Sequence, residues 1–223
     1  MLTPRRDFLR KAGAASLLAA GLTLPASAEP FPEPHPEPFS GPWDLTWPDR
    51  VTGRFRAVFD SPDVADGDAI FRAMVWCDNY KEAYGTPRSD MSPVLVLRHK
   101  GLRLALNDAM WKRFDFGKDS KVLTPDGKEW AVANPVLSSD PSAGEPFASY
   151  TLPNFIARGG IVLGCGVAFG EVVSRLKKAD AVSDSVARQR ALEALVPGVI
   201  LQPSGVFAVL RAQEAGCKYI IAS

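Results

Sequence analysis

The most informative run of the sequence is residues 160–170, which read Gly-Ile-Val-Leu-Gly-Cys-Gly-Val-Ala-Phe-Gly. Three consecutive aliphatic residues predict a short buried strand, and the residues after Cys165 continue as helical sequence. The glycines on either side of Cys165 allow the backbone to turn sharply and leave the sulfur approachable. This stretch therefore predicts a strand that leads directly into a helix, with a thiol at the junction.

The same change from a short apolar run to helical spacing recurs along the chain. Further strands are expected at residues 54–59, 94–97, 199–201 and 219–221, and helices at 66–84, 102–114 and 205–216. Strands that alternate with helices are typical of parallel sheets covered on both faces. The expected fold class is α/β, a three-layer α/β/α sandwich around a mostly parallel five-stranded sheet.

The composition is that of an ordinary globular domain. The chain has 223 residues, 46% of them hydrophobic, with 26 Lys and Arg against 25 Asp and Glu. This length is sufficient to bury a core, and the balanced charge offers no basic field for nucleic acid, which is not expected as a partner. Three cysteines are too few for a disulfide scaffold, so at least one thiol is free or pairs between chains.

The first 28 residues have the features of an export signal. Arg5 and Arg6 precede Phe8 and Leu9, a weakly apolar stretch follows, and Ala-Ser-Ala at 26–28 supplies the small residues of a cleavage site. This pattern predicts a twin-arginine translocation signal, the translocation machinery as a partner, and a periplasmic location. The apolar stretch is shorter than the roughly 20 residues that span a bilayer, so no stable membrane span is expected after cleavage.

The rest of the chain divides into a linker and a domain. Residues 29–50 carry proline at nearly every second position up to Pro38 and predict an extended strap, which Phe39, Trp43 and Trp47 would pin to the domain surface. The domain covers 51–223, with an insertion at about 115–152 that lacks clear periodicity. A Pro-Asp-Gly turn within it predicts a small hairpin, and the insertion either covers a site, makes a subunit contact or is a surface loop.

Candidate site residues come from the carboxyl ends of the predicted strands, which meet at one edge of a parallel sheet. They are Ser61, His99, Lys100, Cys165, Gly166, Gln202 and Ser204. Free N–H groups at a helix N-terminus favour a thiolate, so Cys165 is the candidate catalytic residue, with His99 or Lys100 as groups that would support its charge. The alternative is that Cys165 is a small buried hydrophobe.

The remaining chemistry of the sequence is sparse. Cys77 and Cys217 are expected near the opposite edge of the sheet, where they would pair only if the first helix neighbours the last strand. The sequence has neither a phosphate-binding loop nor a clustered set of His and Cys, and Gly-Cys-Gly at 164–166 lacks the third glycine of a dinucleotide site. No metal and no cofactor are therefore expected.

Three stretches of the domain resemble the DsrE/DsrF-like sulfur-relay family. They are residues 54–62, residues 160–170 with their Cys-Gly-Val-Ala core, and the closing segment 195–220. The resemblance implies a flavodoxin-like topology, a homo-oligomer, and a role for Cys165 as a persulfide carrier between sulfur donor and acceptor thiols or proteins. The predicted export distinguishes this chain from the members of the family that act in the cytoplasm. A non-catalytic small-ligand-binding or oligomeric assembly module of the same fold is the alternative.

Overall fold

The structure is a computed structural model, and it describes residues 43–139 and 144–223. The predicted export signal, with Arg5, Arg6, Phe8 and Leu9, lies outside the described residues. The same holds for the proline-rich part of the strap up to Phe39. The fold is therefore that of the predicted domain together with the last residues of the strap.

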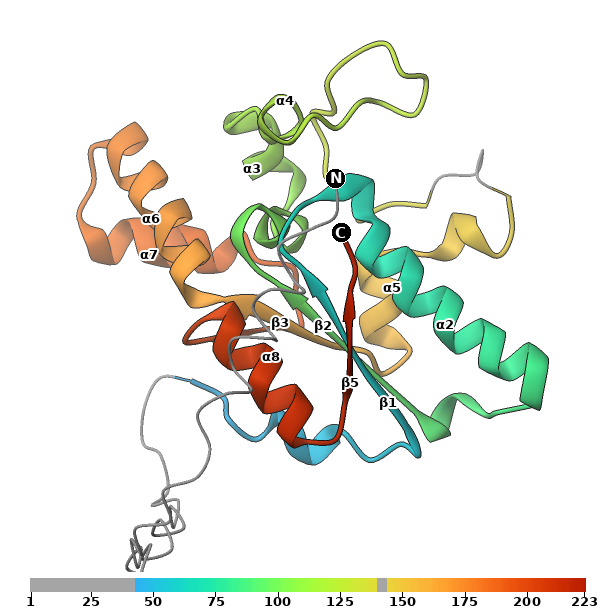
Figure 1. Cartoon of the computed structure of the whole chain (residues 1–223). Coiled ribbons are helices and arrows are strands. Elements are labelled where there is room, and N and C mark those ends of the chain that lie inside the picture. Colours follow the sequence, from blue (N-terminus) through green and yellow to red (C-terminus); the bar gives the residue numbers. More distant parts are fainter. Residues whose placement is uncertain (1–42, 140–143) are drawn as a thin grey trace, which may run out of the picture. The chain divides into compact units, whose positions relative to one another are not determined.

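The centre of the domain is a parallel sheet of five strands (Figure 1). The strands are β1 (Phe55–Ser61), β2 (Met91–Leu97), β3 (Ile161–Cys165), β4 (Val199–Gln202) and β5 (Lys218–Ile221). Their order across the sheet is β4-β3-β2-β1-β5, and each neighbouring pair is parallel. All five predicted strands are confirmed, as is the α/β fold class.

The finer prediction of a flavodoxin-like topology is wrong. In that topology the strand order is 2-1-3-4-5, so β2 lies on one side of β1, and β3, β4 and β5 follow on the other side. Here the chain adds β2, β3 and β4 on one side of β1 and returns to place β5 on the other side. Hydrophobic periodicity identifies strands but carries no information about their neighbours, which explains the error.

Helices cover both faces of the sheet and enclose two core clusters (Figure 1). The larger cluster joins one face to α2 (Asp68–Tyr84), α3 (Asp108–Arg113), α4 (Phe116–Ser120), α5 (Leu152–Ala157), α6 (Gly166–Asp180) and α7 (Asp184–Glu193). The smaller cluster joins the other face to α8 (Gly205–Glu214) and to Trp47. The three-layer arrangement is therefore confirmed. Within the described residues, no helix combines the length and apolarity required to cross a membrane.

The helix predicted at 102–114 is interrupted. Residues His99–Ala105 form a 3₁₀ helix, and α3 begins only at Asp108. Between them Leu106 forms an isolated antiparallel bridge with Leu195, and the side chain of Asn107 accepts a hydrogen bond from the Met110 N–H at 3.1 Å. Asn107 is thus an N-cap that starts a new helix. Continuous apolar spacing across these residues concealed the break.

The insertion is partly fastened to the domain. The predicted hairpin is confirmed by an antiparallel bridge between Leu123 and Trp130. Asn134 is 2% exposed, and its side-chain amide donates to the carbonyl oxygens of Leu104 at 2.9 Å and Leu106 at 2.7 Å. These bonds fix the described part of the insertion to the segment that follows β2.

Candidate functional site

Cys165 lies where the sequence places it, at the carboxyl end of β3. It is the last residue of the strand and the N-cap of α6, so the first free N–H groups of that helix follow it directly. The thiol is free but only 6% of the residue is exposed. The position of a strand-to-helix thiol is confirmed, while its catalytic role stays a prediction.

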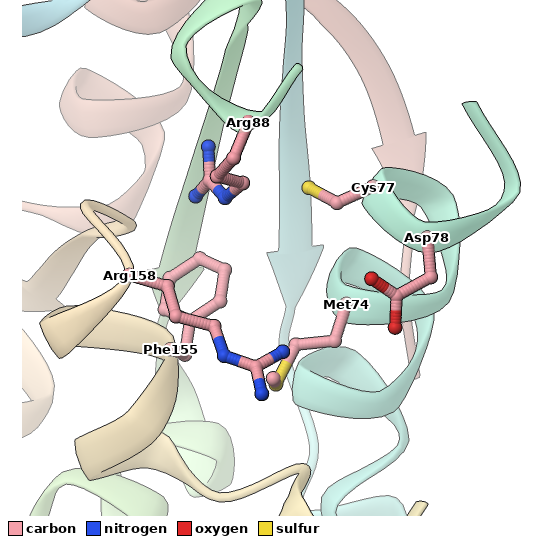
Figure 2. Close-up of a pocket in the computed structure, with 6 residues that line it drawn as sticks. All are labelled: Met74, Cys77, Asp78, Arg88, Phe155 and Arg158. Carbon is pink, nitrogen blue, oxygen red and sulfur yellow. The ribbon is translucent and has the colours of Figure 1, made fainter. Parts of the chain in front are cut away.

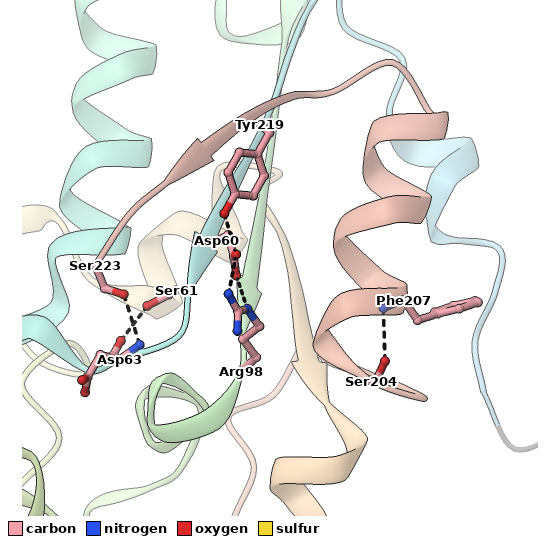
Figure 3. Close-up of polar contacts among 8 residues, drawn as sticks. All are labelled: Asp60, Ser61, Asp63, Arg98, Ser204, Phe207, Tyr219 and Ser223. Atoms are coloured by element: carbon pink, nitrogen blue, oxygen red, sulfur yellow. Dashed lines mark hydrogen bonds and ion pairs between the residues drawn. The ribbon is translucent and has the colours of Figure 1, made fainter. Parts of the chain in front are cut away.

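A charged cluster occupies the same edge of the sheet (Figure 3). Arg98, directly after β2, donates from Nε to one carboxylate oxygen of Asp60 at 2.7 Å and from a terminal nitrogen to the other oxygen at 2.9 Å. The hydroxyl of Tyr219 on β5 donates to the same carboxylate at 2.9 Å. Asp60 is 2% exposed, so two donors from neighbouring segments offset the cost of burying its charge.

The Arg98 guanidinium is also close enough to Cys165 that an ionised thiol would act on it. Its pKa is raised, chiefly by the hydrogen bonds to Asp60 and also by the negative charges of Asp60, Tyr219 and Cys165 when these are ionised. A Cβ on Gly205, the first residue of α8, would lie 2.4 Å from the Cβ of Arg98, so only glycine leaves room for the arginine stem. Gly205 thus leaves the space that the Arg98 side chain occupies while it binds the buried carboxylate.

His99 and Lys100 face a different hollow. Both line a cavity of about 40 Å³ together with Arg103, Phe116, Glu171 and Arg175, and Cys165 does not line it. His99 adopts a left-handed backbone conformation, with φ of 47°. Among residues 43–139 and 144–223, no hydrogen bond joins either side chain to Cys165. Support of the thiol by His99 or Lys100 therefore stays a prediction.

Gln202 fastens the strap to the sheet. It is fully buried, its side-chain amide donates to the carbonyl oxygen of Asp44 at 2.7 Å, and its side-chain oxygen accepts from the Trp47 indole at 3.0 Å. Trp47 is 1% exposed, which confirms that it pins the strap. A Cβ on Gly166 would lie 2.9 Å from the Trp43 ring, so Trp43 lies against the residue that follows Cys165.

The two predicted hydroxyl donors make hydrogen bonds within the protein. Ser204 is the N-cap of α8 and accepts from the N–H of Phe207 at 3.1 Å (Figure 3). The hydroxyl of Ser61 donates to the carbonyl oxygen of Asp63 at 2.7 Å. Both residues therefore shape the loops at the strand ends.

The other two thiols are free and lie on opposite faces of the sheet. Cys77 is on α2, whereas Cys217 packs in the core cluster of α8, so the two do not pair. Burial raises the pKa of both thiols to about 11. At neutral pH they stay protonated and are therefore poor nucleophiles.

The surroundings of Cys77 form a small polar hollow (Figure 2). It is lined by Met74, Cys77, Asp78, Arg88, Phe155 and Arg158 and holds about 20 Å³, room for about one water molecule. The Tyr150 hydroxyl donates to Asp78, and burial raises the pKa of Tyr150. Arg88 and Arg158 act to lower the pKa of Cys77, but the desolvation of the thiol outweighs them. This hollow is too small for a substrate.

Metal-binding residues do not cluster in the described ranges. In residues 43–139 and 144–223, no three side chains of His, Cys, Asp or Glu lie close enough to hold a metal ion together.

Comparisons with known proteins add little to this geometry. The sequence matches no protein-family model and no curated protein. Among solved structures, the chain is similar to a protein of unknown function, MTH1491, from Methanobacterium thermoautotrophicum, with 13% sequence identity and a TM-score of 0.38. The similarity covers 75% of this chain and 98% of that chain, and at this level it carries no functional argument.

Sequence reasoning missed Asp60, Arg98 and Tyr219 as a site. Asp60 and Arg98 each end an apolar run, and a charged residue at the carboxyl end of a predicted strand is the signal that identifies them. Tyr219 gives no such signal, because its contact with Asp60 exists only when β5 lies beside β1.

Proposed function

We propose that this protein is a thiol-dependent sulfur carrier that works through Cys165. The observation that carries the proposal is the position of the thiol, at the junction of β3 and α6 where the free N–H groups of the helix begin. The N-terminus of a helix is a setting in which proteins stabilise thiolates. A carrier needs an anionic sulfur before and after loading, so the same setting would serve both states.

The proposed reaction is a sulfur exchange with a persulfide donor. The Cys165 thiolate attacks the outer sulfur of the donor, a new S–S bond forms on Cys165, and the S–S bond of the donor breaks. The electron pair of the broken bond leaves on the donor thiolate. Attack by an acceptor thiolate on the outer sulfur reverses this exchange and restores the Cys165 thiolate, so the two steps consume no external oxidant or reductant.

Arg98 would stabilise the anion, and its partners would hold it in place. Asp60 accepts from two nitrogens of the guanidinium, and the Tyr219 hydroxyl donates to one of the same two carboxylate oxygens, so Asp60 and Tyr219 are positioning residues. The donor must also reach the thiol of a residue that is only 6% exposed. Since Trp43 lies against Gly166, we expect removal of the Trp43 ring to increase access to Cys165.

The setting of this reaction rests on the sequence. The twin-arginine pattern would direct the mature protein to the periplasm. The family resemblance implies donor and acceptor thiols or proteins as partners and a homo-oligomer as the assembly. In an oxidising compartment the resting thiol requires a reduced partner or protection from disulfide formation. The burial of Cys165 would give such protection.

Sulfur loading tests the proposal directly. The folded full chain is incubated with glutathione persulfide, and its intact mass is measured. We expect a species heavier by one sulfur atom that disappears in Cys165→Ser and persists in Cys77→Ser and Cys217→Ser, the two matched controls. Equal loading of Cys165→Ser would contradict the proposal, as would no loading of the natural chain.

A non-catalytic small-ligand-binding or oligomeric assembly module is the second candidate. The burial of Cys165 favours it, as does the use of Ser61, Gln202 and Ser204 in internal hydrogen bonds. Alkylation of the folded chain separates the two functions. A carrier thiol reacts with iodoacetamide without denaturant, whereas a purely structural Cys165 reacts only after unfolding.

A further inference from the structure

The edge of the sheet at β5 lacks the cover that parallel sheets normally have. Strands of such sheets are usually buried on both faces, yet Tyr219 is 45% exposed and Ile221 is 48% exposed. In the described chain β5 pairs only with β1, so the backbone groups on its outer side have no strand beside them. An edge of this kind is a template for a further strand.

An aromatic groove runs beside this edge and is lined by residues of α2, β1 and β5. Two neighbouring hollows of about 500 and 430 Å³ share Arg54, Phe55 and Tyr80 as lining residues. We call them together the α2–β5 groove, and its lining includes Arg54, Phe55, Arg56, Trp76, Tyr80, Tyr84 and Lys218.

The aromatic side chains of the groove form a continuous row. Trp76, Tyr80 and Tyr84 are four residues apart on α2, and their successive ring centroids are 5.5 and 5.7 Å apart. Phe55 from β1 meets Tyr80 with centroids 4.8 Å apart. Tyr84 is 77% exposed, so the row ends in solvent. Exposed aromatic rings that lie together on one surface mark binding sites.

The charge of the groove is positive and unneutralised. Arg54 lies over the Phe55 ring at 5.0 Å, and neither Arg54 nor Lys218 forms an ion pair with any residue in 43–139 or 144–223. Among the lining residues the one carboxylate is Asp90, in the hollow of Tyr84. A ligand for this groove therefore brings its own negative charge.

We propose that the α2–β5 groove binds an extended peptide segment of a partner protein, which adds to the outer edge of β5 as a further strand. Residues i and i+2 of such a segment share a face, so one face would place carboxylates beside Arg54 and Lys218 and an apolar side chain on the aromatic row. Main-chain hydrogen bonds to β5 would supply affinity, and the groove would supply selectivity for acidic and apolar side chains.

Two other occupants fit less well. A second copy that added its own β5 would bring Lys218 and no carboxylate to the groove. Single-stranded nucleic acid would stack on the aromatic row. Of the three lining cations, however, Arg56 already donates to the carbonyl oxygens of Gly53 and Ala215. The other two, beside a carboxylate, form a weak footprint for a chain of phosphates. Charge complementarity thus selects an acidic peptide.

A fluorescein-labelled heptapeptide, Thr-Glu-Thr-Leu-Thr-Glu-Thr, is the probe. Its glutamates and leucine share one face of a strand, and its binding to the full chain is measured by fluorescence anisotropy. We expect saturable binding that is about tenfold weaker in Lys218→Glu and in Tyr84→Ala. Lys112→Glu and Trp130→Ala, which change an exposed lysine and an exposed tryptophan outside the groove, should bind as the natural chain does.

Hydrogen–deuterium exchange locates the bound peptide. The amides of residues 218–221 should gain protection when the heptapeptide is added, and a peptide with N-methylated central residues should give none. The proposal is overturned if anisotropy does not change, if Lys218→Glu binds equally well, or if protection appears elsewhere. It is also overturned if β5 is already protected in a dimer of the full chain, or if labelled oligothymidine binds with the same dependence on Tyr84 and Lys218.

Discussion

Arg98 connects the strand ends that make up the candidate site. It follows β2, binds Asp60 at the end of β1 through two nitrogens, and reaches Tyr219 of β5 through that carboxylate. The sequence indicates Asp60 and Arg98 as strand-end residues, because each follows an apolar run directly. Neither the pairing of their side chains nor the place of Tyr219 follows from the sequence, since both depend on the neighbours of β1.

Replacement of Arg98 by methionine should destabilise the protein strongly. Arg98→Met keeps most of the side-chain volume but leaves the buried Asp60 carboxylate with one donor, so we expect a loss of about 2 to 3 kcal/mol in the free energy of unfolding. Urea denaturation measures it. The matched control is Arg72→Met, which removes an exposed pair with Asp68 and should cost less than about 1 kcal/mol. Equal losses in the two variants would refute the structural role of Arg98.

The raised pKa values of the Cys77 and Cys217 thiols predict that the protein becomes less stable in alkaline solution. Their pKa is about 11 in the folded protein, above the value of about 8.5 for an exposed thiol, so the folded state holds both protons more tightly. The free energy of unfolding should therefore fall as the pH rises from about 8.5 to about 11. Denaturation of the natural chain and of Cys77→Ala with Cys217→Ala across this interval measures the effect. A decline of the same steepness in the double variant would show that other groups cause it.

At the scale of elements, the sequence predicts where strands and long helices lie but not every break between them. The strand-to-helix junction at Cys165 and the helix α2 follow from apolar spacing and from the residues at their ends. The single helix expected at 102–114 does not form, because Leu106 instead makes a β-bridge with Leu195, a residue far away in the sequence. Tertiary contacts of this kind override local periodicity.

The hydrogen bond that joins Trp47 of the strap to Gln202 can be tested by substitution. Trp47→Phe keeps an aromatic ring but removes the N–H that donates to Gln202, and it leaves a buried amide oxygen without that partner. We expect the free energy of unfolding to fall by about 1 to 2 kcal/mol and trypsin to cleave faster at Arg50. Trp130→Phe, at an exposed position, is the control and should leave both quantities unchanged. Unchanged cleavage at Arg50 in Trp47→Phe would mean that this hydrogen bond does not hold the strap.

For the whole molecule, the alternation of strands and helices predicts the three layers, while the strand order emerges only from the structure. The last crossover carries the chain past β1 and sets β5 at the free edge, where it brings Tyr219 to Asp60 and opens the α2–β5 groove. Both proposals depend on this geometry in different ways. Sulfur transfer needs the edge where β3 meets α6, and peptide binding needs the outer side of β5.

The site of sulfur attachment tests the central claim most directly. The folded full chain is loaded with glutathione persulfide, the persulfides are alkylated, and the peptides are mapped by tandem mass spectrometry. The account predicts the added sulfur on the peptide that contains Cys165, and its transfer to an added acceptor thiol. Added sulfur confined to Cys77 or Cys217, or a Cys165 that stays unmodified until the protein is unfolded, would contradict it.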